Sequence, residues 1–267
     1  MSTKSNIPNP YKADSEPTVP RVLVIGLASC YGCQLQITNI ETHLLEVLGQ
    51  IDLKYWQLLS SIPMPTDFDV VVIEGAVTTE ESLQAVTSLR EHAQTVIAIG
   101  ACANTAGVCG IAAKDYDSRA RQVYCDGLPS ACGEAIVPRR VADVIKVDYQ
   151  VPCCPIDPFE FLEVLDKALY GSNHRLTTNT MCGDCKINET ACFYGIQKLC
   201  MGLVTRAGCG ARCVNLGRPC NGCRGLSPDA NLASAREAVA RYGVDVASFD
   251  AALELFNQTN PIISGKE

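Results

Sequence analysis

Cysteine is concentrated in one stretch of this chain. Eight of the sixteen cysteines fall between Cys182 and Cys223, and residues 208–223, GCGARCVNLGRPCNGC, hold four of them with few apolar side chains between. From about 175 to 228 neither helical nor strand periodicity persists, so this segment lacks the apolar residues for a core of its own. The chain begins without an export signal, and the cytosol disfavours disulfides. Bound metal or clusters are therefore the expected use of these thiols.

The cysteines of this stretch form two groups of four, each with one C-x-x-C pair. The first group is Cys182, Cys185, Cys192 and Cys200, and the second is Cys209, Cys213, Cys220 and Cys223. Four thiolates with one tight pair are typical of iron–sulfur clusters, and glycine-rich backbone can point N–H groups at the sulfides. Four thiolates also suit structural zinc. The residues of this stretch alone leave both metals open.

Apolar runs alternate with amphipathic stretches over residues 21–174. The runs VLVIG, VVVIEG and VIAIG are apolar on both faces, as strands covered by helices on each side should be. IDLKYWQLL and VADVIKVDY are predicted as further strands, and QLQITNIETHLLEVLG, TEESLQAVTSLREHA and DPFEFLEVLDKALYG as helices. Residues 101–136 are less regular and are expected to form a long loop or insertion with some helix. The pattern predicts an α/β fold with a flavodoxin-like, doubly wound, mainly parallel sheet.

The chain is expected to divide into three parts. Residues 1–20 are predicted as a flexible arm, residues 21–174 as the flavodoxin-like domain, and residues 175–267 as an irregular cysteine-rich domain with short C-terminal helices at ANLASAREAVARYG and DVASFDAALELF. A net charge of -7 argues against a nucleic-acid partner, and no apolar window is long enough for a transmembrane helix. We therefore expect a cytoplasmic protein with no nucleic-acid partner and no membrane partner.

Four cysteines and one carboxylate lie where predicted strands end. Cys30 and Cys33 follow the first strand, Cys102 follows VIAIG, Cys154 follows VIKVDY, and Glu74 ends VVVIEG. Because open α/β sheets bind ligands at the carboxyl ends of their strands, we expect these side chains at one edge. A thioredoxin-like dithiol would explain neither Cys102 nor Cys154. Zinc and an iron–sulfur cluster both remain compatible with the four thiols.

The remaining cysteines and the histidines receive no role from the sequence. Small buried thiols are common, and a further site built from the irregular insertion is a weaker alternative. Histidines in helical patterns more often serve as core or surface residues than as ligands. The unassigned residues are Cys109, Cys125, Cys132, Cys153, His43, His92 and His174.

The motifs resemble those of a known family. In this order, SCYGCQ, VIEGA, IGACA and CCPIDP, followed by a cysteine-rich segment, are similar to the small subunit of nickel–iron hydrogenases, from residue 21 to about 225. Within that family, SCYGCQLQ, CGDCKINETAC and VTRAGCGARC look most like the delta subunit of soluble, cytoplasmic, NAD(P)-linked sulfhydrogenases. The family's usual Gly-Cys-Pro-Pro motif is replaced by CCPIDP, so that Cys153 stands where relatives have glycine; adjacency to Pro155 favours Cys154 as the ligand of this pair.

The resemblance implies three [4Fe-4S] clusters and no catalytic residue on this chain. Cys182 and Cys213 stand where many relatives have a histidine and a proline, so four-iron clusters are expected at both of their sites. Glu74 would lie beside the proximal cluster, or serve as an alternative ligand to it. The implied ligands are Cys30, Cys33, Cys102 and Cys154 for the proximal cluster, Cys209, Cys213, Cys220 and Cys223 for the medial cluster, and Cys182, Cys185, Cys192 and Cys200 for the distal cluster.

The resemblance also implies partners. A nickel–iron large subunit would carry the hydrogen chemistry, and iron–sulfur and flavin diaphorase subunits would exchange electrons with NAD(P). The small subunit of a coenzyme F420-reducing or heterodisulfide-reductase-coupled hydrogenase would have the same clusters with a different terminal acceptor. The related quinone-reductase subunit of respiratory complex I has tandem cysteines at its first ligand site, whereas this chain has a spaced pair. A zinc-stabilised binding module is the alternative from another class.

Overall fold

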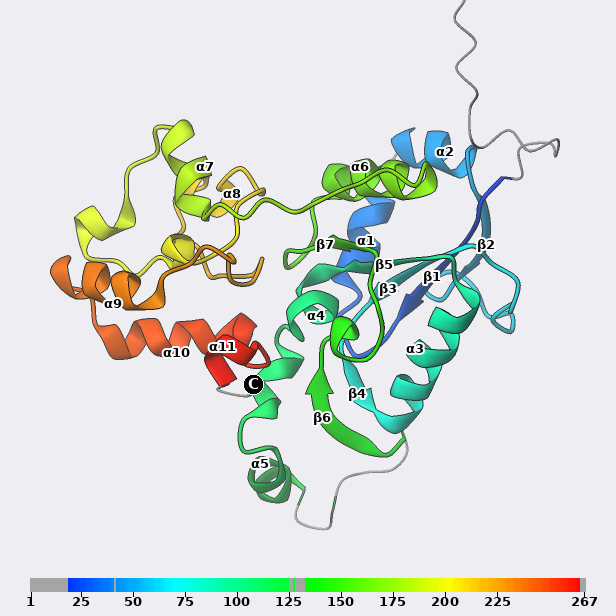
Figure 1. Cartoon of the computed structure of the whole chain (residues 1–267), viewed down its shortest axis with the longest axis horizontal. Helices are drawn as coiled ribbons and strands as arrows, with labels where there is room; N and C mark the ends of the chain where they lie inside the picture. The colour runs from blue at the N-terminus through cyan, green and yellow to red at the C-terminus, as the bar shows by residue number, and fades with distance from the viewer. Residues whose placement is uncertain (1–18, 41, 125–126, 128–132, 265–267) are drawn as a thin grey trace, which may run out of the picture.

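The computed structural model describes residues 19–40, 42–124, 127 and 133–264. Most of the expected N-terminal arm, together with Cys125 and Cys132, lies outside these residues. An α/β part and a cysteine-rich part lie side by side in an elongated molecule (Figure 1). Among the described residues, no helix combines the length and the apolar character needed to cross a membrane.

The α/β part is built on one five-stranded sheet. All four strand pairings are parallel, and the strand order is β2-β1-β3-β5-β7. Counted within this sheet, the order is 2-1-3-4-5, the flavodoxin-like pattern, whose topological switch point lies between β1 and β3. The predicted doubly wound, mainly parallel sheet is therefore confirmed. The strands are β1 (Arg21–Gly26), β2 (Asp52–Trp56), β3 (Val70–Glu74), β5 (Thr95–Ile99) and β7 (Tyr149–Val151).

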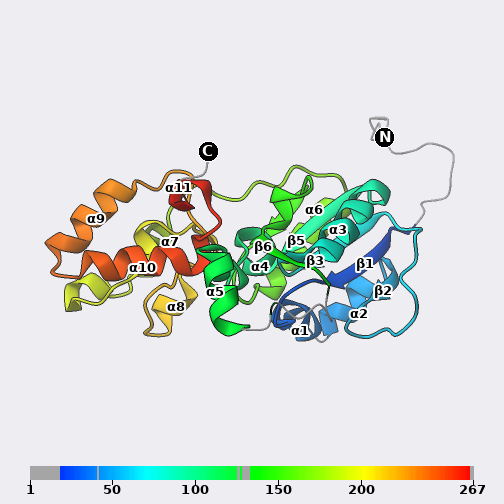
Figure 2. The same cartoon turned by 90° about the horizontal axis from the view of Figure 1, so that it is seen from below.

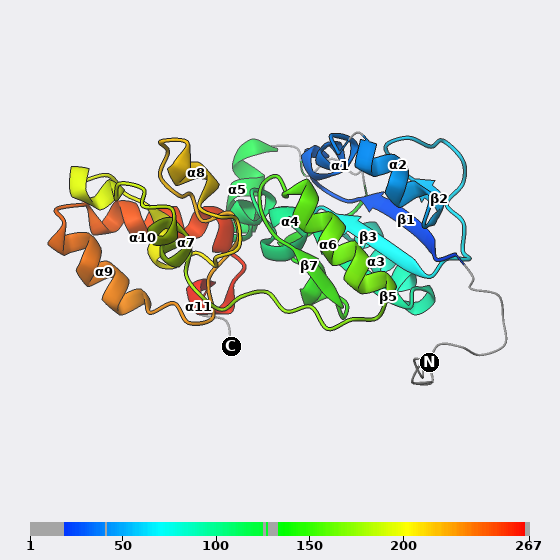
Figure 3. The same cartoon turned by 90° about the horizontal axis from the view of Figure 1, so that it is seen from above.

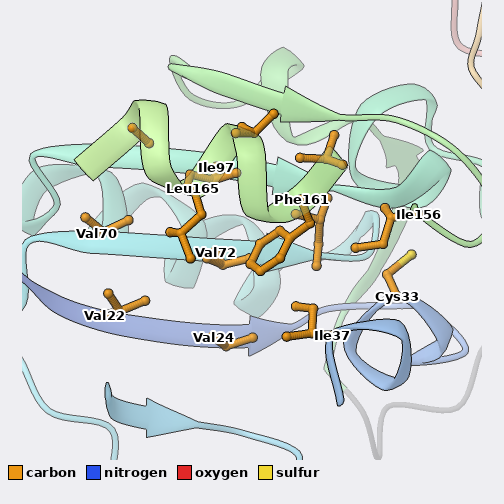
Figure 4. Packing of buried hydrophobic residues seen from close by; sticks show 14 of the residues in the cluster. Val22, Val24, Cys33, Ile37, Val70, Val72, Ile97, Ile156, Phe161 and Leu165 are labelled. Atoms are coloured by element: carbon orange, nitrogen blue, oxygen red, sulfur yellow. The ribbon is translucent and has the colours of Figure 1, made fainter. Parts of the chain in front are cut away.

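Helices cover both faces of this sheet. On one face α1 (Gly32–Thr38), α2 (Thr42–Leu48) and α6 (Pro158–Leu169) pack against alternate residues of β1, β3 and β5. Figure 4 shows Phe161 and Leu165 of α6 seated on Val72 and Ile97 of the strands. On the other face, α3 (Glu80–His92) supplies Val86 and Leu89 to a second core. Burial on both faces explains why these strands are continuously apolar.

Two predicted elements differ in detail. The single expected helix over QLQITNIETHLLEVLG is two helices, α1 and α2. The strand prediction for VADVIKVDY was wrong over most of its length, because Val141–Asp143 form a 3₁₀ helix, η2, and β7 begins only at Tyr149. Val141 and Ile145 are both buried against the α3 face. Their spacing of four residues suits a helical turn, and it overrides the β-branched composition.

The irregular residues 101–136 contain more structure than a loop. These residues include most of α4 (Gly100–Thr105), the 3₁₀ helix η1 (Cys109–Ala113) and α5 (Tyr116–Val123). This agrees with the expectation that the segment contains some helix. The sequence did not indicate a small second sheet, in which β6 (Ala135–Arg139) pairs antiparallel with β4 (Val77–Thr79).

The cysteine-rich part shares its core with the C-terminal helices. Met181, Met201 and Val214 of the irregular segment pack with Phe249 and Leu253. The two predicted C-terminal helices are confirmed: α9 (Leu232–Arg241) lies at the end of the molecule away from the sheet, and α10 (Val246–Asn257) runs from there back towards η1 and α4 (Figures 2 and 3). The other helices of this part are α7 (Met181–Ile187), η3 (Phe193–Ile196), η4 (Met201–Leu203), α8 (Arg212–Asn215) and α11 (Pro261–Ser264).

Candidate thiol-lined metal centres

The first group of thiols lies at the carboxyl edge of the sheet. Cys30 occupies the loop after β1, Cys33 the first turn of α1, and Cys102 the first turn of α4 directly after β5. Cys154 follows β7. Glu74 is the last residue of β3 and pairs in register with Gly26 and Ile99. The parallel register therefore brings the ends of β1, β3 and β5 to one level, at the topological switch point.

Glu74 ties the C-x-x-C turn to the sheet. Its side chain is 1% exposed, and Oε1 accepts a hydrogen bond of 3.0 Å from the backbone N–H of Cys33. The second oxygen, Oε2, has no hydrogen-bond partner among the described residues. Because a buried carboxylate oxygen without a partner is costly, it points to a missing binding partner at this edge. The sequence-based choice of Glu74 as a site residue is compatible with that observation.

Glycines keep space open around the same thiols. A Cβ added to Gly100 would come within 2.5 Å of the Cys33 sulfur, and one added to Gly107 within 3.0 Å of the Cys102 sulfur. A Cβ added to Gly32 would lie 3.2 Å from the Cys30 sulfur. Side chains at these positions would crowd the sulfurs, so the chain leaves a cradle around them.

Burial makes these thiols hard to ionise in the protein alone. Burial, and then the nearby Glu74 carboxylate, raises the pKa of the Cys33 thiol. Burial also raises the pKa of Cys154, with Cys30 and Cys153 adding to the effect. Thiols bind metals as thiolates, so a bound positive centre would have to displace these protons. The donor set is soft sulfur throughout, which selects zinc or iron–sulfur clusters over hard cations.

Two residues to which the sequence assigned no role, Cys109 and Asn104, lie beside this site. The hydrogen bond between Cys102 and Cys109 raises the pKa of Cys102 and lowers that of Cys109 to about 7. The Asn104 amide, which is buried, donates to the backbone oxygens of Ala98 and Gly100 at 3.0 and 2.9 Å. Asn104 thereby fixes the turn from β5 into α4 that presents Cys102. Neither residue belongs to a motif, so only the folded chain places them here.

The group nearest the N-terminus of the cysteine-rich part comes together around α7. Cys182 and Cys185 lie three residues apart on this helix and therefore on one face. Burial, and then the neighbouring Cys200, Cys185 and Cys192 thiols, raise the pKa of Cys182 to about 11. A Cβ at Gly202 would lie 3.4 Å from the Cys182 sulfur and 3.6 Å from that of Cys200. The structure thus brings together the four residues grouped from spacing.

The other group surrounds the start of α8 and the loop that follows it. Burial raises the pKa of Cys209 and of Cys213, and Cys209 acts on Cys213 as an electrostatic neighbour. Burial raises the pKa of Cys220 to about 12, with Cys200 and Cys209 among the neighbours that contribute. The backbone N–H of Cys220 donates to the Cys200 sulfur at 3.2 Å. The two groups of this part therefore meet at Cys200 and Cys220.

The unassigned Cys153 connects the α/β part with this last group. A hydrogen bond with the Cys223 side chain raises the pKa of the Cys153 thiol. Arg224 donates to the Cys153 sulfur at 3.4 Å and holds both carboxylate oxygens of Glu160 on α6 at 2.7 and 2.8 Å. No sequence motif indicated Arg224, Glu160 or the direction of the Cys153 side chain.

The thiols do not converge on single ions. Over residues 19–40, 42–124, 127 and 133–264, no three His, Cys, Asp or Glu side chains are placed to hold one metal ion. A structural zinc site needs four ligands around one centre. The soft donors and the glycine cradles fit an inorganic group larger than one ion.

Comparisons with known proteins agree with this description. Residues 30–168 match the family described as NADH ubiquinone oxidoreductase, 20 Kd subunit. The chain is 31% identical over 210 residues to sulfhydrogenase 2 subunit delta of Pyrococcus furiosus, which covers 78% of this chain and 87% of the relative. It is 26% identical over 281 residues to a vhu subunit of the F420-non-reducing hydrogenase of Methanocaldococcus jannaschii, covering 92% and 97%. A chain of an NAD+-reducing [NiFe]-hydrogenase in the H2-reduced state has a similar fold, with a TM-score of 0.50 and 22% identity over 60% of this chain and 96% of that one.

The fold and the thiols define an oxidoreductase subunit of the hydrogenase small-subunit class. The chain belongs to the NADH ubiquinone oxidoreductase 20 Kd subunit family. The family match ends at residue 168, within α6, whereas the two hydrogenase relatives match 78% and 92% of the chain. This longer match favours the hydrogenase branch over the quinone-reductase subunit weighed from the sequence.

Proposed function

We propose that this hydrogenase small subunit holds three [4Fe-4S] clusters and carries electrons between a nickel–iron large subunit and a flavin-containing NAD(P) diaphorase module. The proximal ligands would be the four thiols at the sheet edge, and the medial and distal ligands the two groups of the cysteine-rich part. When bound, the clusters supply one-electron carriage. The observation that supports this proposal best is a series of neighbouring thiols from the sheet edge into the cysteine-rich part, which runs through Cys154, Cys153, Cys209, Cys220 and Cys200.

The protein's own residues would position and shield this series. The sheet edge and α1 fix Cys33, which is 6% exposed, while Cys200 and Cys220 are 8% and 9% exposed. Such burial excludes water from the sulfurs. Cys30, Cys154 and Cys192 are exposed. We assign Cys30 and Cys154, which belong to the proximal group, to the face that meets the large subunit. Cys192 would lie on the face that meets the electron-accepting partner.

The partners and the compartment belong to the same proposal. The names of the two hydrogenase relatives describe each of them as one subunit of its enzyme. The large subunit would perform the hydrogen chemistry, and this chain would contribute no catalytic residue. A cytoplasmic location is part of this proposal.

Iron and sulfide analysis tests the cluster content. The chain, purified anaerobically, should contain about twelve irons and as many acid-labile sulfides, and should show EPR signals after dithionite reduction. Cys30→Ser should lose about four irons, while Cys109→Ser, which alters a thiol outside the ligand sets, should retain all of them. A colourless protein with zinc and no sulfide would instead establish the zinc-stabilised module.

Electron flow tests the partners. In the complex, Cys30→Ser should abolish hydrogen-dependent reduction of NAD(P) and leave hydrogen chemistry at the large subunit partly intact. An unchanged rate of NAD(P) reduction in this variant would contradict the proposed electron path.

A second candidate differs only in the terminal acceptor. The match to a component of an F420-non-reducing hydrogenase covers 92% of this chain, which favours weighing an enzyme with another acceptor, such as a heterodisulfide reductase, beside the NAD(P)-linked one. The F420-reducing enzyme stays the alternative that the sequence resemblance offers. Purification with the native partner subunits discriminates between them. A flavin diaphorase and NAD(P) reduction support the first candidate, and heterodisulfide or F420 reduction supports the second.

A further inference from the structure

A polar cavity lies where the α/β part, the linker after α6 and the cysteine-rich part meet. It has a volume of about 220 Å³ and lies beside β7, the edge strand of the five-stranded sheet. The linker is held near β7 by the Tyr149 hydroxyl, which donates to the backbone oxygen of Ser172 at 2.7 Å. Residues 147–150 and 174–176 line the cavity from the α/β part and the linker, and Arg206 lines it from the cysteine-rich part.

The carboxylate in this lining is already neutralised. Asp148 accepts hydrogen bonds from Arg90 Nη1 at 2.6 Å and from the backbone N–H of Val96 at 2.9 Å. Its other oxygen lies 3.2 Å from Lys146 Nζ. Asp148 therefore has its own cations, and it does not serve as the counter-ion of the cavity's arginines.

Two guanidinium groups make the cavity cationic. Arg175 is exposed, and Arg206 is half-buried. Burial, and then the neighbouring Arg224, lower the pKa of Arg206, and no carboxylate among the described residues opposes them. The Arg206 guanidinium nevertheless stays charged, because arginine does not lose its proton in proteins. A partly buried charge without a counter-ion is costly, so an anion bound here would stabilise it.

His174 adds a hydrogen-bond donor to the lining. Its Nδ1 lies 3.4 Å from Lys167 Nζ and accepts from it, because an ammonium group can only donate. The proton of the neutral ring is then on Nε2, which is buried and has no hydrogen-bond partner among the described residues. Glu163 on α6 pairs with the same Lys167 ammonium. His174 thus has a buried N–H that lacks an acceptor.

We propose that this cavity binds a phosphate group, which the guanidinium groups of Arg175 and Arg206 and the Nε2–H of His174 recognise together. The arginine fork matches phosphate oxygens in both geometry and charge. Cavities that hold larger ligands measure about 300 to 1,000 Å³, so a cavity of about 220 Å³ suits inorganic phosphate or the phosphate of a small ester. No described cysteine lines this cavity, and the inference is independent of the proposed electron path.

Calorimetric titration with inorganic phosphate tests this site. The full-length chain is purified anaerobically and kept in Tris chloride at fixed ionic strength, so that phosphate competes with chloride alone. The variants are Arg206→Ala, Arg206→Lys, Arg175→Ala and His174→Phe. The matched control is Arg218→Ala, which removes an exposed arginine of the cysteine-rich part that does not line the cavity. Iron content and Tm without phosphate show that each variant is folded.

The wild-type chain should bind a single phosphate, and its Tm should rise with phosphate concentration by mass action. Arg206→Ala should weaken binding about tenfold or more, because it removes a charged donor. Arg206→Lys should weaken it less, since the charge remains without the fork. Arg175→Ala alters an exposed residue and should also weaken binding in a folded chain, so the test survives if Arg206→Ala is unstable. His174→Phe should weaken binding too, and Arg218→Ala should leave the affinity unchanged.

A second titration, with glycerol 3-phosphate, distinguishes the sources of the phosphate group. Tighter binding than that of inorganic phosphate would identify an ester as the ligand, and equal or weaker binding would identify free phosphate. Absence of binding of both probes to the folded wild-type chain, with an unmoved Tm, would overturn the proposal. Equal weakening in Arg218→Ala and Arg206→Ala would also overturn it, because phosphate would then be attracted by the general positive charge of this part alone.

Discussion

The two thiol-rich regions differ in what holds their sulfurs in place. At the sheet edge, the thiols project from strands and helices that have their own apolar cores, and every residue of β3 is buried. In the cysteine-rich part, Cys200 and Cys220 are themselves members of the core, and most of the chain between them is irregular. The first region is a scaffold that carries its ligands, of which only Cys33 is packed in an apolar core, whereas in the second Cys200 and Cys220 are part of the scaffold. Stability of the second region should therefore depend on what the thiols bind.

Removal of iron is the strongest test of this difference. Anaerobic chelation in the presence of a thiol reductant should unfold much of residues 181–226 and leave the sheet intact, because the core of the cysteine-rich part includes two of the proposed ligands, whereas the strands of the sheet are held by apolar cores on both faces. Hydrogen exchange followed by mass spectrometry should show loss of amide protection in η4 and α8, with protection of β3 and β5 retained. Equal protection of both regions in the iron-free chain would contradict the comparison.

The next largest effect is expected from the core that the cysteine-rich part shares with α10. Phe249 is 0% exposed and packs in this core, so Phe249→Ala should cost about 3 to 5 kcal/mol of unfolding free energy. The loss should appear in the transition of the cysteine-rich part and should lower its iron content. Calorimetry with iron analysis measures both.

Matched variants show whether this effect is local. Leu255→Ala, also on α10 but 37% exposed, should cost much less than Phe249→Ala. Ile97→Ala in β5 should cost about 2 to 5 kcal/mol in the transition of the α/β part. Loss of medial and distal iron from Ile97→Ala to the same extent as from Phe249→Ala would show that the two regions unfold as one.

The sequence predicted the α/β part well because its signals are local. Continuous apolar runs identify strands buried on both faces, and the rule that ligands bind at the carboxyl ends places Cys30, Cys102 and Glu74 together. The prediction failed at VADVIKVDY, where Val141 and Ile145 pack as a helical turn although their residue types favour strands. Composition could not separate these outcomes, because tertiary packing decided between them.

The thiol groups were predictable from spacing, but the contacts between them were not. The group that runs from Cys182 to Cys200 comes together as its spacing predicts. Its C-x-x-C pair lies on one face of α7, and such a short-range feature can be recognised in a sequence. The junction of Cys153, Arg224 and Glu160 joins residues 64 to 71 positions apart, and depends on how α6 meets the cysteine-rich part. No periodicity or motif encodes such a contact.

The buried ion pair at this junction should contribute a smaller, measurable part of the stability. Arg224→Ala removes the partner of Glu160, whose side chain is 16% exposed, and leaves a partly buried carboxylate without compensation. The expected loss of unfolding free energy is about 3 kcal/mol, measured by chemical denaturation of the iron-loaded chain. Arg212→Ala breaks the more exposed pair with Asp157 between the same two regions and should cost less than about 1 kcal/mol. Equal losses in the two variants would show that burial does not distinguish these contacts.

Lowering the pH should destabilise the protein through carboxylates at the opposite edge of the sheet, where no thiols lie among the described residues. At this amino-terminal edge, the hydrogen bond from Arg21 lowers the pKa of Asp69, and hydrogen bonds from Val96 and Arg90 lower that of Asp148 against the opposing effect of burial. A carboxyl whose pKa is depressed in the folded state stabilises the protein above its unfolded pKa of about 3.9, and this contribution is lost as pH falls through the folded value. The α/β part should therefore keep its stability from pH 6 to about 4 and lose it progressively below.

The Asp69→Asn variant tests this dependence and its independence from iron. Its deficit in unfolding free energy relative to wild type should be largest at neutral pH and should shrink below about pH 4, because protonation removes the same charge from the wild type. Asp67→Asn alters an exposed partner of the same Arg21 guanidinium, with a side chain 79% exposed, and should cost less than about 0.5 kcal/mol. Because these pairs lie away from the thiols, denaturation of iron-loaded and iron-free chains should give the same Asp69→Asn deficit for the α/β transition. A deficit that disappears with iron would mean that the sheet, too, depends on the bound centres.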